Sequence, residues 1–463
     1  MGIKAAYMVP HPPLIVPAVG RGGEKDIAET TRAYERVAEH IAKIAPDTII
    51  ITSPHSVMYA DYFHISPGTG SAGDFARFGA PQVSFDVDYD TEFVERLEVL
   101  LKQNRFPAGT QGERERELDH GTMVPLYFIR KHYKEGKIIR IGLSGLPLAD
   151  HYKLGMFIKQ VAEELDRNAV FVASGDLSHK LQDYGPYGFD PAGPVYDKRI
   201  MEAASKADFG AMLEFDEEFL DKATECGHRS FVIMAGAFDG LDVKPEVLSH
   251  QDVTGVGYGI AIFEPGDKND SRCFLKAIAD KIKATESTPY VMLARATIEQ
   301  FVKTGKRLKF PSELPAGLAE ALPEEATKER AGAFVSVHKN GMLRGCIGTI
   351  GPVQDSIAEE IISNAISAVS RDPRFERVRE DELELLEINV DILGKPENID
   401  GPDQLDVKRY GVIVSCGARK GLLLPDLEGV DTVEEQIDIA RRKGGISPDD
   451  DYKLQRFEVV RYK

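Results

Sequence analysis

The sequence predicts an α/β fold in two domains: a mixed sheet covered by helices on both faces, followed by a smaller α+β domain. From residue 4 to residue 263, continuous apolar segments alternate with segments of helical periodicity. Strands without polar alternation are buried on both faces, which requires helices on both sides of the sheet. After residue 265 the pattern changes to short strands, turns and a proline-rich stretch at 310–323, which indicates a second architecture.

Hydrophobic periodicity predicts the strands and helices of the first domain. Residues 24–44 carry apolar side chains at helical spacing, and this helix should end before Pro46. The segment TIIIT at 48–52 is a β-branched run typical of a buried strand. The other predicted strands cover residues 4–9, 137–143, 169–173, 247–252 and 257–263. The other predicted helices cover residues 92–103, 122–133, 149–166 and 231–238.

A polar, turn-rich segment, EPGDKNDS at 264–271, marks the expected domain boundary. We expect a first domain over residues 1–265, a linker over 266–273 and a second domain over 274–463. Helices of the second domain are predicted at 274–284, 289–304 and 353–368.

Composition and charge narrow the class of function. The 463 residues carry a net charge of −18, which disfavours nucleic acid or an anionic membrane as the main partner. The four cysteines form no CxxC motif, which is typical of a reduced protein. The N-terminus lacks the apolar core of a signal peptide, and the chain has no run of about 18 apolar residues. We therefore expect a cytoplasmic protein with no membrane segment.

Three histidines follow the ends of predicted buried strands. His11 comes after the strand at 4–9, His55 after TIIITSP, and His179 after FVASGDLS. In an open α/β sheet, ligands bind outside the carboxyl ends of the strands, so we expect these side chains to share one crevice. Two histidines and a carboxylate form the metal site of non-haem Fe(II) oxygenases. Any one of these histidines, taken alone, is better explained as a surface or core residue, whereas three at matching strand ends favour a shared site.

Four motifs in this order and spacing resemble the class III, LigB-like extradiol ring-cleavage dioxygenases: VPHPPLIVP, SPHS, DHGTMVPL and SGDLSHKL. The resemblance covers about residues 1–265. It implies that His11 and His55 bind Fe(II), that His120 contacts the substrate and that His179 acts as the acid–base residue. It also implies a small aromatic substrate, a catechol or an aminophenol, which is cleaved with O2.

The same resemblance implies a late glutamate as third metal ligand, and two adjacent residues compete for that role. The segment ATECGHRSF places Glu225 shortly before a predicted helix, where a carboxylate is readily held. Cys226 lies beside it, and the related Memo proteins use a cysteine in a similar context. We favour Glu225, because cysteine–histidine sites suit zinc or copper better than an oxygen-activating iron. Cys226 is then a small buried apolar side chain.

Three stretches stand out in the second domain: NGMLRGCIGTI at 340–350, SRDPRF at 370–375 and GVIVSCGARKGLLLPD at 411–426. In the first, Arg344 and Cys346 in a glycine-rich turn suggest a place where backbone and thiol approach a small anion or a partner. The alternative is a strand and turn with a buried cysteine. Together the stretches resemble the AMMECR-type domain, AmmeMemoRadiSam system protein A, over about residues 274–463.

The fusion of these two domains implies a dedicated modification or biosynthetic pathway with a radical SAM protein as partner. It makes Arg344 a candidate for anion binding and Cys346 a candidate for nucleophilic or redox chemistry. Three functions follow: an Fe(II) extradiol dioxygenase, a Memo-like redox or hydrolytic protein with zinc or copper, and a non-catalytic scaffold. The four intact motif histidines disfavour the scaffold. The oligomeric state is left open, with a homo-oligomer among the alternatives.

Overall fold

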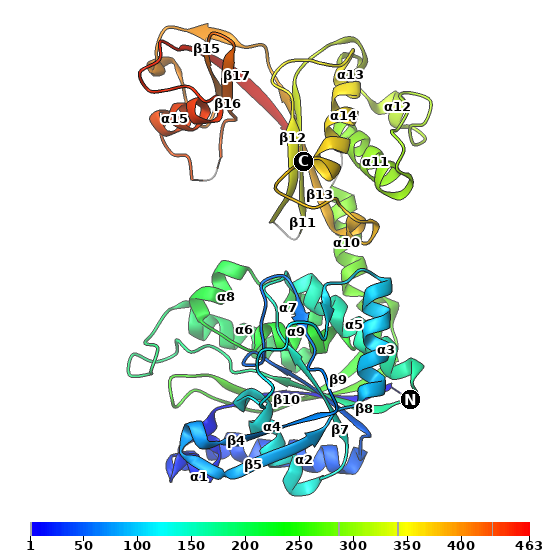
Figure 1. Ribbon diagram of the computed structural model, residues 1–463, viewed down its shortest axis with the longest axis vertical. Helices are drawn as coiled ribbons and strands as arrows, with labels where there is room; N and C mark the ends of the chain where they lie inside the picture. The colour runs from blue at the N-terminus through cyan, green and yellow to red at the C-terminus, as the bar shows by residue number, and fades with distance from the viewer. Residues whose placement is uncertain (1, 286–287, 340–341, 428) are drawn as a thin grey trace. The chain divides into compact units, whose positions relative to one another are not determined.

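The structure, a computed structural model shown in Figure 1, describes residues 2–285, 288–339, 342–427 and 429–463. The chain divides into two compact units, Met1–Leu275 and Lys276–Lys463. The predicted fold class is confirmed, because a mixed sheet among helices is followed by a strand-rich unit with its own sheet. Among the described helices, none is both long enough and apolar enough to cross a membrane.

A six-stranded sheet forms the centre of the first unit, in the order β7-β2-β8-β1-β10-β9. The first four strands of this order run parallel, while β10 is antiparallel to both β1 and β9. The carboxyl ends of β2, β8 and β1 therefore lie next to one another at one edge. The strands are β1 (Gly2–Val9), β2 (Thr48–Ser53), β7 (Lys137–Gly142), β8 (Asn168–Ser174), β9 (Leu241–Gln251) and β10 (Tyr258–Lys268).

Helices cover both faces of this sheet, as Figure 1 shows. Successive strand residues point to opposite faces, so Ile49 and Ile51 belong to one apolar cluster and Ile50 to the other. This explains why the strands read as continuous apolar runs. The helices on one face are α2 (Ala28–Ile44) and α4 (His120–His132). The helices on the other face are α3 (Thr91–Gln103), α5 (Leu148–Glu164), α6 (Ala192–Lys206) and α9 (His228–Gly236).

Short elements that the sequence pattern did not predict surround the main sheet. An antiparallel pair, β4 (Gly70–Phe75) and β5 (Ala80–Asp88), is joined by a 3-10 turn at Ala76–Phe78. Two further short strands, β3 (Phe63–His64) and β6 (Ala108–Gly109), pair in parallel. The remaining elements of this unit are Pro13–Ile15, α1 (Pro17–Gly20), Gly23–Ile27, α7 (Phe209–Leu213), α8 (Glu217–Ala223) and Asp270–Arg272.

The linker expected at 266–273 is wrong over its first part. Strand β10 continues through Pro265 to Lys268 and pairs with β9 as far as Leu241. The register shifts between Pro265 and Lys268, and such an irregularity tolerates a proline, which has no amide hydrogen to donate. The polar composition of this segment therefore reflects an exposed strand end.

The second unit contains a curved sheet in the order β12-β11-β13-β17-β15-β16, and β14 pairs with β17. Helices α11 and α14 pack on β11 and β13 to form its larger core. Helix α14 begins at Ile357 because Ser356 caps it, four residues later than predicted. The strands are β11 (Ala333–Lys339), β12 (Met342–Gly348), β13 (Leu386–Leu393), β14 (Glu397–Ile399), β15 (Tyr410–Cys416), β16 (Arg419–Leu423) and β17 (Lys453–Tyr462). The helices are α10 (Phe274–Thr285), α11 (Pro289–Thr304), α12 (Leu318–Ala321), α13 (Glu324–Lys328), α14 (Ile357–Ser370) and α15 (Val433–Lys443), with short turns at Glu380–Leu385 and Pro402–Gln404.

Candidate functional site

The candidate site lies at the carboxyl ends of the three adjacent strands β1, β2 and β8. His11 follows β1 and His55 follows β2, each two residues after its strand ends, while His179 follows β8. His120 is the first residue of α4, and the side chain of Asp119 caps that helix. The rings of His11, His55 and His120 lie within 5.4 Å of one another, centroid to centroid. The structure thus brings together two of the strand-end histidines, His11 and His55, with His120, and the third, His179, shares a donor group with Cys226.

Three donor atoms converge at the centre of this site. The Nε2 atoms of His11 and His55 are 3.0 Å apart, and Sγ of Cys226 lies 3.6 Å from Nε2 of His11. All three donors lie within 4.8 Å of one another. In a tetrahedral site with bonds of about 2.0–2.3 Å, ligand atoms are roughly 3.3–3.6 Å apart. The spacing therefore suits a single metal ion.

The hydrogen bonds of His11 define which ring nitrogen is free. Ser174 Oγ donates to the carbonyl oxygen of Gly121 at 2.6 Å, so its hydroxyl proton is already engaged. It must therefore accept the 3.0 Å hydrogen bond that it shares with His11 Nδ1. That assignment leaves the lone pair of His11 on Nε2, facing His55 and Cys226. A buried partner that fixes tautomer and ring orientation is typical of metal-binding histidines.

Glu225, the favoured third ligand, is not among the converging donors. The carboxylate of Glu225 accepts a hydrogen bond from the backbone amide of His228, at the start of α9. It does not join His11 and His55 in the described group of donors, whereas Cys226 does. The physical reason is that α9 begins three residues earlier than predicted, so its first turn engages this carboxylate. Burial raises the pKa of Glu225 to about 7.

Cys226 is half-buried and lies near two acidic side chains. The backbone amide of Asp176 donates to its sulfur at 3.3 Å. Burial, with nearby Asp176 and Glu225, raises the pKa of the thiol well above its ordinary value. A bound cation reverses such a shift, because a coordinating thiol is deprotonated.

Two further histidines lie beside this group, and their surroundings favour the neutral imidazole. His179 Nδ1 donates to the carbonyl oxygen of Thr224, which can only accept, so the lone pair of His179 is on Nε2. Burial, with a smaller effect of His55, lowers the pKa of His179. The ring of His120 stacks on His55 with centroids 4.1 Å apart. Burial and His55 lower the pKa of His120 to about 4.

A cavity of about 860 Å³ adjoins the histidines, with His55 and His120 among its lining residues. Phe78 contributes a ring edge to His120 at 5.4 Å between centroids. Acidic and basic side chains line the rest of the cavity, and the basic ones include Arg77 and Arg116. The site therefore opens into a space large enough for a small organic substrate.

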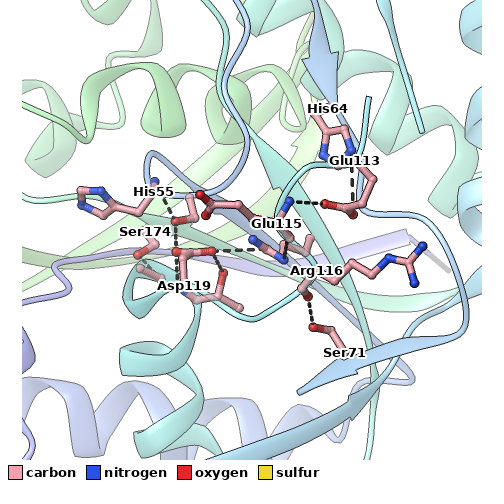
Figure 2. A network of polar contacts seen from close by, with 12 residues as sticks. His55, His64, Ser71, Glu113, Glu115, Arg116, Asp119 and Ser174 are labelled. Carbon is pink, nitrogen blue, oxygen red and sulfur yellow. Dashed lines mark hydrogen bonds and ion pairs between the residues drawn. The ribbon is translucent and has the colours of Figure 1, made fainter. Parts of the chain in front are cut away.

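A buried ion pair anchors the segment that walls this cavity. Asp119 accepts from Ser53 Oγ at 2.5 Å and from Arg140 Nε at 3.2 Å, and Arg140 is 1% exposed. In the view of Figure 2, Ser174 and His55 lie on the opposite side of Asp119 from Arg116. Asp119 thus connects the start of α4 with β2 and β7.

Sequence reasoning missed several residues that shape the site. The ring of Tyr187 meets His179 edge-on, with centroids 5.0 Å apart, and Tyr184 and Phe189 of the same loop are exposed. Ser174 was overlooked although it immediately precedes the GD of SGDLSH. The sequence did contain a signal, because three aromatic residues fall within six positions of this loop. Such a cluster predicts an aromatic edge to the site beside His179.

The two candidates of the second unit lie in strand β12, and the expected glycine-rich turn is wrong. A Cβ at Gly345 would lie 2.2 Å from the carbonyl oxygen of Ala368, and one at Gly348 would lie 2.1 Å from the ring of Phe334. These glycines therefore allow close packing within the unit. Asn340 and Gly341 of the same motif lie outside the described residues.

Arg344 is committed to a structural ion pair. Its Nε and Nη2 atoms each lie 3.0 Å from an oxygen of Glu382, and Nη1 donates to a backbone carbonyl. Glu382, which also pairs with Lys339, thus holds the guanidinium of Arg344 within the unit, and a role of Arg344 in anion binding stays a prediction. Cys346 is half-buried, and Ser336 Oγ donates to its sulfur at 3.1 Å. Its backbone amide donates to Asp372.

Comparisons with known proteins place the chain among related sequences. Residues 5–261 match the family model of the catalytic LigB subunit of aromatic ring-opening dioxygenase, and residues 291–463 match the AMMECR1 model. Protein CA_C1420 of Clostridium acetobutylicum is 42% identical over 100% of both chains. A Thermotoga maritima protein is 52% identical, over 38% of this chain and 97% of its own length.

Two solved structures are each similar to a part of the chain. The crystal structure of the uncharacterized protein PH0010 from Pyrococcus horikoshii is 32% identical, over 39% of this chain and 90% of its own, with a TM-score of 0.33. That of the uncharacterized protein JW3007 from Escherichia coli K12 is 14% identical, over 56% of this chain and 99% of its own, with a TM-score of 0.38. On its matched families and its full-length relative, the chain belongs to the LigB family of aromatic ring-opening dioxygenase catalytic subunits and carries an AMMECR1 domain after the LigB domain.

Proposed function

We propose that the first domain is a metal-dependent redox or hydrolytic enzyme whose metal is held by His11, His55 and Cys226. One observation carries this proposal: Sγ of Cys226 lies within reach of both histidine Nε2 atoms, while the carboxylate of Glu225 is engaged elsewhere. A thiolate with two imidazoles suits zinc or copper better than an oxygen-activating iron.

The residues present fit such an ion. His11 presents a lone pair on Nε2 because Ser174 fixes its other nitrogen, and the three donors have ligand spacing. Three protein ligands leave a coordination position open, as catalytic sites require. When bound, the metal would act as a Lewis acid toward a substrate oxygen or a water molecule.

The surrounding residues supply the acid–base and electrostatic functions. His179 is held by Thr224 with Nε2 free, so it accepts a proton from the substrate or water at that atom and later returns it. His120 stabilises negative charge that develops on the substrate, since its ring lies against His55 at the cavity wall. Tyr187 packs edge-on against His179 and is itself half exposed.

A second candidate is Fe(II)-dependent extradiol cleavage of a catechol or aminophenol with O2. The match to the LigB family over residues 5–261 favours it. In that reaction His179 would take the proton of a substrate hydroxyl, and His120 would stabilise the charge of the bound substrate. The cavity can hold a substrate of that size.

Anaerobic purification, metal analysis and an oxygen-uptake assay with a panel of catechols separate the two candidates. Tightly held zinc or copper, with no oxygen uptake after iron loading, is the expected result. Oxygen uptake by the iron-loaded protein, lost in a His179→Ala variant, would replace the first candidate with the second. A radical SAM protein as partner stays a prediction, tested by co-purification from cells that express both proteins.

A further inference from the structure

Cys226 belongs to two groups of donor atoms. The first is the group with His11 and His55, and the second unites Cys226 with Asp176 and His179. In each group all donor atoms lie within 4.8 Å of one another. We propose that the second group is a second metal position and that Sγ of Cys226 bridges two ions. This inference rests on the proposed metal centre and adds an ion to it.

The available nitrogen of His179 suits a ligand. Its Nδ1 donates to the carbonyl oxygen of Thr224, which leaves the lone pair on Nε2. A backbone carbonyl that fixes the ring in this way is a common partner of metal-bound histidines. Because Thr224 precedes Cys226 by two residues, one short segment orients both the imidazole and the thiol.

Asp176 supplies the second observation. Its side chain is 6% exposed, and Oδ1 accepts the backbone amide of His11 at 2.7 Å. Within the described part of the chain, this is the only hydrogen bond made by the carboxylate. Buried carboxylates are normally paired with a cation or saturated with hydrogen bonds. An ion shared with His179 and Cys226 provides the missing partner.

The arrangement also fits the chemistry of centres with two ions. Such ions lie about 3.5–4 Å apart, which a shared ligand allows. Two divalent cations would face one thiolate and one carboxylate from the chain, and the remaining charge would attract an anionic substrate oxygen or hydroxide. The second ion would bind more weakly than the first, because it shares a thiolate that is already coordinated.

Occupation of the second position changes the role of His179. With one ion bound, Nε2 of His179 is free to accept a proton; with two ions, its lone pair is used for coordination. We therefore expect excess metal to remove the general base from the site.

Metal stoichiometry of the full chain tests the proposal. Protein stripped with a chelator is titrated with Co²⁺, and bound metal is counted after equilibrium dialysis and followed by thiolate-to-cobalt absorption. We expect two ions in the natural chain and one in His179→Ala and in Asp176→Asn. The asparagine keeps an oxygen to accept the amide of His11. His55→Ala should also hold one ion, and Cys226→Ser should hold none at the same concentration.

Two controls accompany these variants. His132→Ala removes a histidine that pairs with Glu35 on the surface, and Asp183→Asn alters an exposed carboxylate. Both should still bind two ions. One ion in the natural chain at saturation overturns the second position alone, and so does retention of two ions by His179→Ala. No bound ion in the natural chain overturns the proposed metal centre as well.

Discussion

Ser174 should control metal affinity through the ring of His11. Its hydroxyl is fully buried, accepts from His11 Nδ1 at 3.0 Å and donates to the carbonyl oxygen of Gly121 at 2.6 Å. In Ser174→Ala both contacts are lost. The bare carbonyl costs about 1–3 kcal/mol of folding stability. That cost is the same with and without metal, so it cancels from the metal affinity.

The loss at His11 does not cancel. Without the serine oxygen, the ring can rotate or place its proton on Nε2, the atom that the metal needs. Removal of such a partner typically weakens metal binding 10–100-fold, or about 1.4–2.7 kcal/mol. Competition titration of Zn²⁺ against a chromophoric chelator measures this difference directly.

A matched control separates affinity from stability. Thr297→Val also removes a fully buried hydroxyl that donates to a carbonyl, at 2.8 Å, but in helix α11 of the second unit. It should lower the melting temperature without changing zinc affinity. If Ser174→Ala binds zinc as tightly as the natural chain does, the argument for an oriented His11 is refuted.

Three further predictions concern the third ligand, a buried histidine and the second unit. Cys226→Ser should lose zinc in equilibrium dialysis, whereas Glu225→Gln should keep it, because only the thiol joins the donor group. Burial lowers the pKa of His151 to about 3 from 6.5, so its folded form resists protonation. This side chain alone should therefore lower the free energy of unfolding by about 1.4 kcal/mol for each unit that the pH falls from 6.5 to 3, measured as the difference between denaturant titrations of the natural chain and of His151→Gln. Glu382→Gln should lower the free energy of unfolding by on the order of 3 kcal/mol, because it breaks the pair with Arg344 and leaves a largely buried charge.

Each of these predictions has a contrary outcome. Zinc retained by Cys226→Ser, or lost by Glu225→Gln, would return the third ligand to the carboxylate. In a His151→Gln variant, the free energy of unfolding should depend less steeply on pH. An unchanged slope would show that other groups cause the pH dependence. Unfolding of Glu382→Gln at the same denaturant concentration as the natural chain would show that Arg344 is not held by this pair.

The positions of the strand ends could be predicted because they depend on the local pattern of apolar residues. Apolar runs located β1, β2 and β8, and parallel strands bring the residues after them to one edge. The choice between Glu225 and Cys226 could not be predicted, because it depends on where α9 begins. A helix start is among the least certain features of a sequence, and here a start three residues earlier than predicted places the amide of His228 against the carboxylate of Glu225.

The same limit applies to the second unit. The sequence pattern predicted that the glycines of this motif form a turn. In the structure, Gly345 and Gly348 instead make room for residues from other segments of the chain. Arg344 was predicted to be available for an anion because its partner, Glu382, comes from another segment. Periodicity predicts elements well, whereas contacts between distant segments require the folded chain.

The origin of the three proposed ligands has a consequence for how such a centre can be altered. His11 and His55 are fixed by the register of a buried sheet, which tolerates little change. Cys226 comes instead from the loop before α9, where the first turn of a helix selects one of two neighbouring side chains. An inserted or deleted residue there would exchange sulfur for oxygen and leave the scaffold intact. One of the three ligands can therefore change while the other two stay in place. Redesign of this single loop should alter which metal the centre prefers.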